Sequence, residues 1–193
     1  MIFCDLDDVL ADFTGAACRI HDKPLPLTWG LYTEWGMSRE DFWEPINNLG
    51  DEFYAEYVKP LPWVDQLLDA CKRADNEFAI LTAPGDNWPG LNGKKEWINR
   101  YVGSDVEVIL CHHKHLLAAP GRLLIDDKYE NCLHFAMFGG ASILFPRPTN
   151  TKWCKPHDSW LMAMDKIRDW GRECRCPQLD LDGAITLNPE FSL

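Results

Sequence analysis

Short apolar runs bounded by turn residues recur along this chain, and stretches with helical spacing of apolar residues lie between them. The runs predict strands at residues 1–5, 77–82, 106–111, 122–126 and 141–145. Helices are expected in between, for example over 63–74 and 94–101. Strands that alternate with helices form a parallel sheet with helices packed on it. With a length of 193 residues, this pattern predicts one α/β domain that is large enough to contain an insertion.

One connection is too long for this alternation. About 70 residues separate the first two predicted strands, whereas a crossover needs little more than one helix. We expect a small helical cap here, inserted above the carboxyl ends of the strands, where open α/β sheets bind ligands. The expected division is an α/β core of residues 1–13 and 75–173, a cap of 14–74 and a C-terminal tail of 174–193. The stretch is rich in aromatic residues, most of which should form its own core while a minority face the cleft: Trp29, Tyr32, Trp35, Phe42, Trp43, Phe53, Tyr54 and Tyr57.

Charge and hydropathy exclude several classes of partner. Lys and Arg number 19 against 30 Asp and Glu, a formal net charge of −11, so stable binding of nucleic acid is not expected. No apolar run approaches the roughly 18 residues of a membrane helix, and no secretion signal is recognisable at the N-terminus. The eight cysteines lack the spacing of a small secreted scaffold. We therefore expect a cytoplasmic protein with reduced thiols and no membrane contact.

The most specific motif is acidic and follows the first predicted strand directly. Asp5 and Asp7 are two residues apart where the chain must turn, which lets their side chains serve different tasks. One carboxylate can act as a nucleophile while the other gives and takes a proton. The plain alternative is an acidic turn that only caps the following helix, and for this motif alone the two interpretations are about equally weighted.

Three further strand ends carry matching chemistry. Thr82 ends the second strand with a hydroxyl that suits a phosphate oxygen, and Lys94 opens the next helix with a positive charge. Asp126 and Asp127 end a later strand as adjacent acids, which require a cation to stay ionised when buried. Because these features occur in order and at strand ends, a purely structural explanation of all of them becomes improbable.

These motifs resemble those of the haloacid-dehalogenase (HAD) superfamily of phosphatases. Within it, residues 8–13, Leu61-Pro62, 94–97 and 124–127 are similar to the 5′(3′)-deoxyribonucleotidases. The likeness covers most of residues 1–148 and is thin in the cap, from about 18 to 52. The family usually has Gly where this chain has Asp8, and a second hydroxyl residue where it has Ala83. The resemblance implies a HAD-like Rossmannoid fold, with three layers and a central parallel sheet.

The resemblance also implies a role for each matching residue. Asp5 would form an aspartyl-phosphate, and Asp7 would be the general acid and base. Mg²⁺ would be held by Asp5, the backbone carbonyl of Asp7, Asp126 and Asp127. The substrate would be held by two groups of residues: Thr82, the backbone N–H of Ala83 and Lys94 for the phosphate, and Phe13, Trp29, Phe42 and Trp43 for the sugar and base.

Other signals compete with these assignments. Lys114 also precedes Asp126, at a place from which other HAD phosphatases supply their lysine, but the Trp97 context favours Lys94. The histidines around Lys114 are expected to follow a strand and face solvent. A zinc site is disfavoured because the spacings of its candidate ligands are unusual: Cys154, His157, Cys174 and Cys176.

The sequence therefore predicts a Mg²⁺-dependent phosphatase that acts on a small nucleoside monophosphate, most simply a deoxyribonucleotide. Two other interpretations stay open: a HAD phosphatase for another small phosphate ester, and a nucleotide-binding protein without turnover. Removal of phosphate ends from DNA is disfavoured by the acidic charge. The base, the 5′ or 3′ position of the phosphate and the sugar are left open, as is the oligomeric state, with a homodimer as one option.

Overall fold

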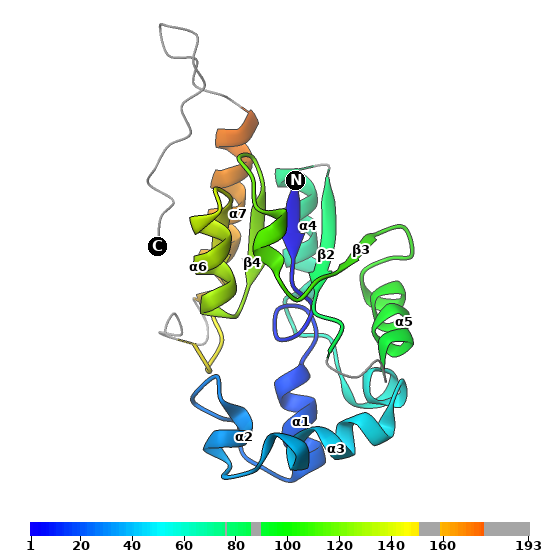
Figure 1. Cartoon of the computed structure of the whole chain (residues 1–193). Coiled ribbons are helices and arrows are strands. Elements are labelled where there is room, and N and C mark those ends of the chain that lie inside the picture. The colour runs from blue at the N-terminus through cyan, green and yellow to red at the C-terminus, as the bar shows by residue number, and fades with distance from the viewer. Residues whose placement is uncertain (76, 86–89, 151–158, 176–193) are drawn as a thin grey trace, which may run out of the picture.

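The five strands predicted from the sequence form one parallel sheet in the computed structural model (Figure 1). The structure describes residues 1–75, 77–85, 90–150 and 159–175. The strand order is β3-β2-β1-β4-β5, so the first strand lies at the centre. The strands are β1 (Ile2–Cys4), β2 (Phe78–Thr82), β3 (Glu107–Leu110), β4 (Leu123–Asp126) and β5 (Ala141–Leu144).

Helices cover both faces of this sheet and give the expected three layers. Successive residues of β1 point to opposite faces, as the alternation of a strand requires. Phe3 packs with Phe135 on one face, whereas Ile2 belongs to the larger core on the other face. The flanking helices are α4 (Val64–Ala74), α5 (Leu91–Tyr101), the 3₁₀ helix η2 (Lys114–Leu117), α6 (Tyr129–Met137) and α7 (Ser159–Arg175).

The long connection between β1 and β2 is helical, as expected. Figure 1 shows α1, α2 and α3 together beyond the carboxyl ends of the strands. Asp12 caps α1 by accepting a hydrogen bond from Gly15 N, and Ser38 caps α3 through Asp41 N. The connection contains α1 (Phe13–His21), α2 (Leu31–Glu34), α3 (Arg39–Leu49), the π-helix η1 (Phe53–Tyr57) and α4.

Two boundaries bear on the expected division of the chain. Helix α4 lies in the range expected for the cap, yet it packs along α7 beside the sheet. Helix α7 continues to Arg175, so the range expected for the tail begins inside a helix. Residues 176–193 of that range lie outside the described residues, and so do Cys154, His157 and Cys176 of the disfavoured zinc set. No helix in the described ranges has the length and apolar character needed to cross a membrane.

Candidate active site

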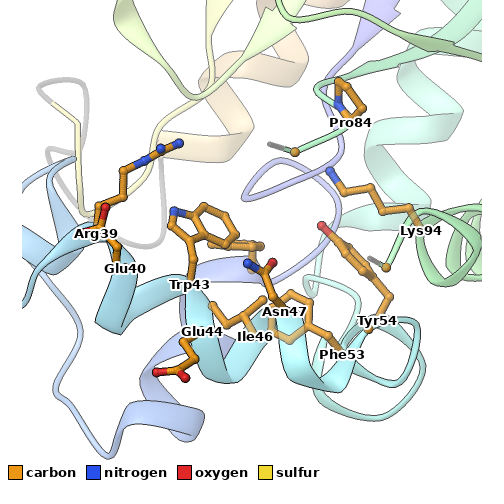
Figure 2. Close-up of a pocket in the computed structure, with 14 residues that line it drawn as sticks. Arg39, Glu40, Trp43, Glu44, Ile46, Asn47, Phe53, Tyr54, Pro84 and Lys94 are labelled. Atoms are coloured by element: carbon orange, nitrogen blue, oxygen red, sulfur yellow. The ribbon is translucent and has the colours of Figure 1, made fainter. Parts of the chain in front are cut away.

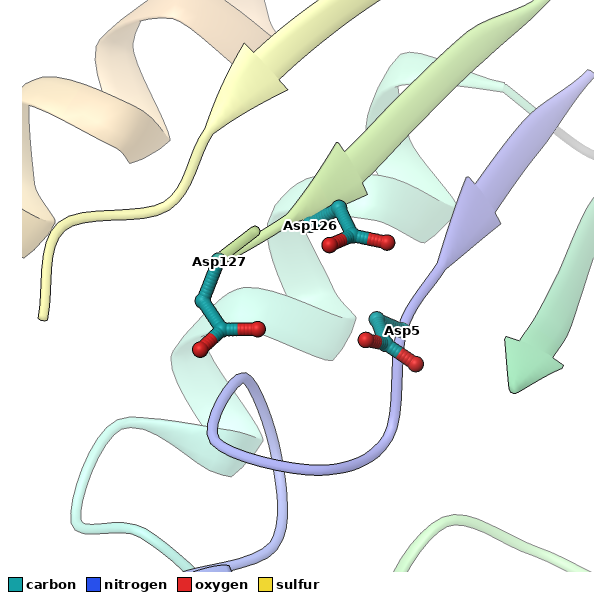
Figure 3. Close-up of side chains that lie close together, drawn as sticks. All are labelled: Asp5, Asp126 and Asp127. Atoms are coloured by element: carbon teal, nitrogen blue, oxygen red, sulfur yellow. The ribbon is translucent and has the colours of Figure 1, made fainter. Parts of the chain in front are cut away.

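The acidic residues that follow β1 and β4 meet because these strands are paired in the sheet. The N–H of Asp5 donates to the carbonyl of Ile125 at 2.8 Å, which continues the pairing beyond the last residue of β1. Oxygens of Asp5, Asp126 and Asp127 consequently lie within 4.8 Å of one another. Figure 3 shows the three side chains together at the ends of the two strands. The structure thus brings together three of the residues predicted to hold a metal.

A buried lysine lies against two of these acids. Nζ of Lys114 is 2.7 Å from Oδ1 of Asp5 and 2.6 Å from Oδ2 of Asp126. Burial alone would lower the pKa of Lys114, but the two carboxylates raise it above its ordinary value. In the histidine-rich run after β3, His112 and His113 are exposed whereas Lys114 is buried. The lysine that the sequence ranked second is therefore the one in contact with the acidic cluster.

Asp126 and Asp127 differ in how their oxygens are satisfied. Asp126 accepts hydrogen bonds from the N–H of Lys128 at 2.9 Å and from the amide of Asn131 at 3.0 and 3.1 Å. Neither oxygen of the buried Asp127 has a hydrogen-bond partner among the residues that the structure describes. A buried carboxylate without a partner is costly, and a cation would satisfy it.

The electrostatics of the cluster favour the same conclusion. Burial raises the pKa of Asp5 to about 7, opposed by Lys114 and reinforced by the neighbouring acids. Burial and the adjacent carboxylates also raise the pKa of Asp127 well above its ordinary value. Carboxylate oxygens are the ligands that Mg²⁺ prefers, so these residues fit that ion.

Asp7 is held on both of its oxygens by residues outside this cluster. Tyr54 donates its hydroxyl to Oδ1 at 2.7 Å, and Lys94 donates to Oδ2 at 2.8 Å. Lys94 also contacts the hydroxyl of Thr82 at 3.3 Å and the carbonyl of Ala83 at 2.8 Å. Burial raises the pKa of Tyr54 well above its ordinary value, and the charge of Asp7 adds to this, so the hydroxyl is a donor at neutral pH.

A cavity of about 400 Å³ lies beside Tyr54 and Lys94. Figure 2 shows these two side chains at one side of the cavity and Trp43 at the other. Phe13 also lines the cavity, with its ring 5.7 Å from that of Trp43 and 5.5 Å from that of Phe53. An apolar wall with a few polar groups is typical of a small-molecule site.

Two residues predicted to contact the base are not among those that line this cavity. Phe42 is 2% exposed and packs inside the insertion, against aromatic rings that include His21 and Trp35. It forms part of the core there because it lies on the inward face of α3. Trp29 is 40% exposed, and Nζ of Lys128 lies 5.8 Å from the centre of its ring.

Some residues near the site had no role assigned to them from the sequence. Asp8 adopts φ 58°, and its carboxylate accepts hydrogen bonds from the N–H and hydroxyl of Thr14. The buried Arg147 lies 3.5 Å from Asp8 and 3.6 Å from Asp12, which joins the loop after β5 to the loop after β1. Burial raises the pKa of Asp8 to about 6, against the opposing effect of Arg147. In the sequence, Asp8 is marked only by standing where the family usually has Gly. Tyr54 is not distinguished from the other aromatic residues of the insertion.

The chain is similar to a nucleotidase family over most of its length. A family model described as 5′ nucleotidase, deoxy (pyrimidine), cytosolic type C protein (NT5C) matches residues 1–170. A protein of Vibrio phage KVP40 assigned as a 5′(3′)-deoxyribonucleotidase is 26% identical over 139 residues, which is 68% of each chain.

Solved structures of HAD hydrolases are also similar, at low identity. One from Deinococcus radiodurans R1, with bound phosphate and sodium, is 15% identical over 86% of each chain, with a TM-score of 0.49. Another, from Entamoeba histolytica, is 12% identical over 89% of this chain and 98% of its own, with a TM-score of 0.46. These likenesses are weaker than the family match.

Proposed function

Because the chain belongs to the family of cytosolic type C deoxy-5′-nucleotidases, and so is a hydrolase of the nucleotidase and phosphatase type, we propose that it releases phosphate from deoxyribonucleoside monophosphates with the help of Mg²⁺. The observation that carries the proposal is the different setting of two carboxylates after β1. Asp5 lies with Lys114 and the acidic cluster, whereas Asp7 lies beside the cavity. This arrangement separates a nucleophile from a proton donor.

Asp5 is the proposed nucleophile. Its Oδ1 already accepts from the N–H of Leu6 at 2.8 Å and contacts Lys114, so we assign Oδ2 as the oxygen that attacks phosphorus. The new bond to phosphorus forms as the bond between phosphorus and the sugar oxygen breaks, which leaves an aspartyl-phosphate. Asp7 gives its proton to the departing sugar oxygen. Asp7 then takes a proton from the water that hydrolyses the aspartyl-phosphate, and Asp5 is regenerated.

Mg²⁺ would be held by Asp5, Asp126, Asp127 and the backbone carbonyl of Asp7. When bound, the ion would neutralise the negative charge of the phosphate and of the acids around it. Lys114, Thr82 and the backbone N–H of Ala83 are assigned to the phosphoryl oxygens. Lys94, which contacts Asp7 in the substrate-free protein, is assigned to the same oxygens when substrate binds. Phosphoryl transfer depends mainly on such positioning and charge neutralisation.

The nucleoside is assigned to the cavity between the insertion and the sheet. A volume of about 400 Å³ lies in the range of small-molecule sites. Phe13 and Trp43 would contact the sugar and stack on the base. The net charge of −11 supports a small substrate over a nucleic acid, because the anionic group of a nucleotide can be met locally by lysines.

The test is phosphate release from a panel of substrates by the wild type and by Asp5→Asn. The panel contains deoxy- and ribonucleoside monophosphates, sugar phosphates and a 3′-phosphorylated oligonucleotide. We expect turnover of deoxynucleotides that is abolished by Asp5→Asn and by EDTA. Preference for a sugar phosphate would support the proposed phosphatase reaction but reject deoxyribonucleotides as the substrate. Nucleotide binding without turnover of any phosphate would reject the function.

A further inference from the structure

Asp7 is fixed from two sides by residues of different origin. The hydroxyl of Tyr54, on Oδ1, comes from the π-helix η1 in the insertion, whereas the ammonium of Lys94, on Oδ2, comes from α5. Tyr54 is 5% exposed and Lys94 is 7% exposed, whereas the side chain of Asp7 is 26% exposed, so the two contacts are partly buried. Nζ of Lys94 also lies 5.4 Å from the centre of the Tyr54 ring. Two buried side chains therefore hold one partly exposed carboxylate.

The position of Tyr54 is set by a tight contact between the insertion and α5. Oδ1 of Asp51 accepts a hydrogen bond from the N–H of Gly93 at 2.9 Å. A Cβ atom at Gly93 would lie 2.4 Å from the carbonyl oxygen of Asp51, so only glycine permits this approach. Since Asp51 comes just before η1 and Gly93 comes just before Lys94, one contact fixes both partners of Asp7.

We propose that Tyr54 is a positioning residue that holds Oδ1 of Asp7, so that Oδ2 is the oxygen presented to the leaving group of the substrate. This inference rests on the proposed function. A carboxylic acid can protonate the sugar oxygen only when its proton-bearing oxygen points at that atom. Lys94 exchanges its contact with Oδ2 for a phosphoryl oxygen when substrate binds, and Tyr54 then remains as the group that stops the carboxyl from rotating.

The alternative is that Tyr54 only fills space. Its ring lies 5.2 Å from that of Phe53 in an edge-to-face arrangement, and it belongs to the buried core. Tyr54→Phe separates the two roles because it keeps the ring and removes the hydroxyl. Tyr57→Phe is the matched control, since Tyr57 lies on the same π-helix, is 37% exposed and does not line the cavity.

The experiment compares kcat/KM of these variants and the wild type on dUMP and on 4-nitrophenyl phosphate. The sugar oxygen of dUMP needs a proton to leave, whereas nitrophenolate does not. General acid catalysis contributes about a hundredfold or more, so Tyr54→Phe should lower kcat/KM on dUMP by about tenfold to a hundredfold and on 4-nitrophenyl phosphate by less than about threefold. Tyr57→Phe should change neither value.

A series of aryl phosphates with increasingly poor leaving groups distinguishes a catalytic effect of the substitution from a loss of folded, active protein. The slope of log kcat/KM against the pKa of the leaving group does not depend on the fraction of active protein. We expect a steeper slope for Tyr54→Phe than for the wild type. An unchanged slope, or equal losses on both substrates, would overturn the positioning role. Failure of the wild type on dUMP and on every aryl phosphate would instead reject the proposed function, and this inference with it.

Discussion

Lys114 and Asp5 form a buried ion pair of 2.7 Å between a 3₁₀ helix after β3 and the turn after β1. The same ammonium lies 2.6 Å from Asp126, so one cation compensates two acids of the cluster. Lys114 therefore has two duties in the proposed reaction. It balances buried charge before substrate binds, and it stabilises the phosphoryl group during transfer.

Lys114→Met should impair both duties. Because an unpaired buried charge is left behind, we expect the metal-free protein to lose about 3 kcal/mol in its free energy of unfolding. Turnover of dUMP should fall by at least about a hundredfold, as for the loss of other transition-state donors. Urea denaturation in EDTA and phosphate release would measure the two effects. Lys72→Met, at an exposed position on α4, is the control that should change neither. Activity within about threefold of the wild type would contradict the assignment of Lys114.

Stabilisation by Mg²⁺ should depend on pH. The pKa of Asp5 is raised by burial from 3.8 to about 7 in the folded protein, so folding takes up a proton between these values. The metal-free protein should therefore lose stability from this group as pH rises from 3.8 to about 7. Mg²⁺ needs the ionised carboxylate, so the rise in Tm that it produces should be larger at pH 8 than at pH 5.5. Thermal unfolding in EDTA and in Mg²⁺ at both pH values tests this, and equal shifts would contradict a site that contains Asp5.

Trp43→Ala should weaken binding of the nucleoside more than the chemistry. Stacking of a base on an aromatic ring contributes about 1–3 kcal/mol, so KM for dUMP should rise about fivefold or more while kcat changes less. Steady-state kinetics on dUMP and on 4-nitrophenyl phosphate, which has no nucleobase, separate the two effects. A parallel rise in KM for both substrates would show that Trp43 shapes the phosphate site instead.

Asp8 is held in a left-handed backbone conformation by its buried contacts with Thr14 and Arg147. Asp8→Gly and Asp8→Ala both remove the carboxylate and leave Arg147 with Asp12, so both should be destabilising. Alanine also retains the strain of φ 58°, which costs about 1 kcal/mol more than glycine. Urea denaturation of the two variants measures this difference. An alanine variant as stable as the glycine variant would mean that the turn relaxes when its ion pair is lost.

The sheet and its acidic residues could be predicted because local pattern determines them. Apolar runs marked the bounds of every strand to within one residue, and the carboxyl ends of parallel strands necessarily meet at one edge. Asp5, Asp126 and Asp127 therefore come together as expected. The long first connection also forms the expected helices beyond these strand ends.

Some contacts in the site could not be predicted, because they depend on how segments distant in the sequence pack against one another. Lys94 and Lys114 both follow turns near strand ends, and only the folded chain shows that Lys114 contacts Asp5 and Lys94 contacts Asp7. Phe42 and Trp43 are adjacent on α3, so their sequence does not say which one faces the cavity. Tyr54 needs the contact between Asp51 and Gly93 to reach Asp7, and no local pattern encodes that contact.

The central position of β1 has a consequence for the order of folding. Ile2 pairs with Phe78 on one side and with Leu123 on the other, and both partners are synthesised long after it. During translation the apolar strand β1 is therefore unpaired until β2 and β4 have been synthesised, and contacts between residues so distant in sequence form slowly. A nascent chain that ends before β4 exposes one edge of β1 and lacks Asp126 and Asp127, and one that ends before η2 also lacks Lys114. Co-translational folding should yield a competent site only after the last of these residues has left the ribosome.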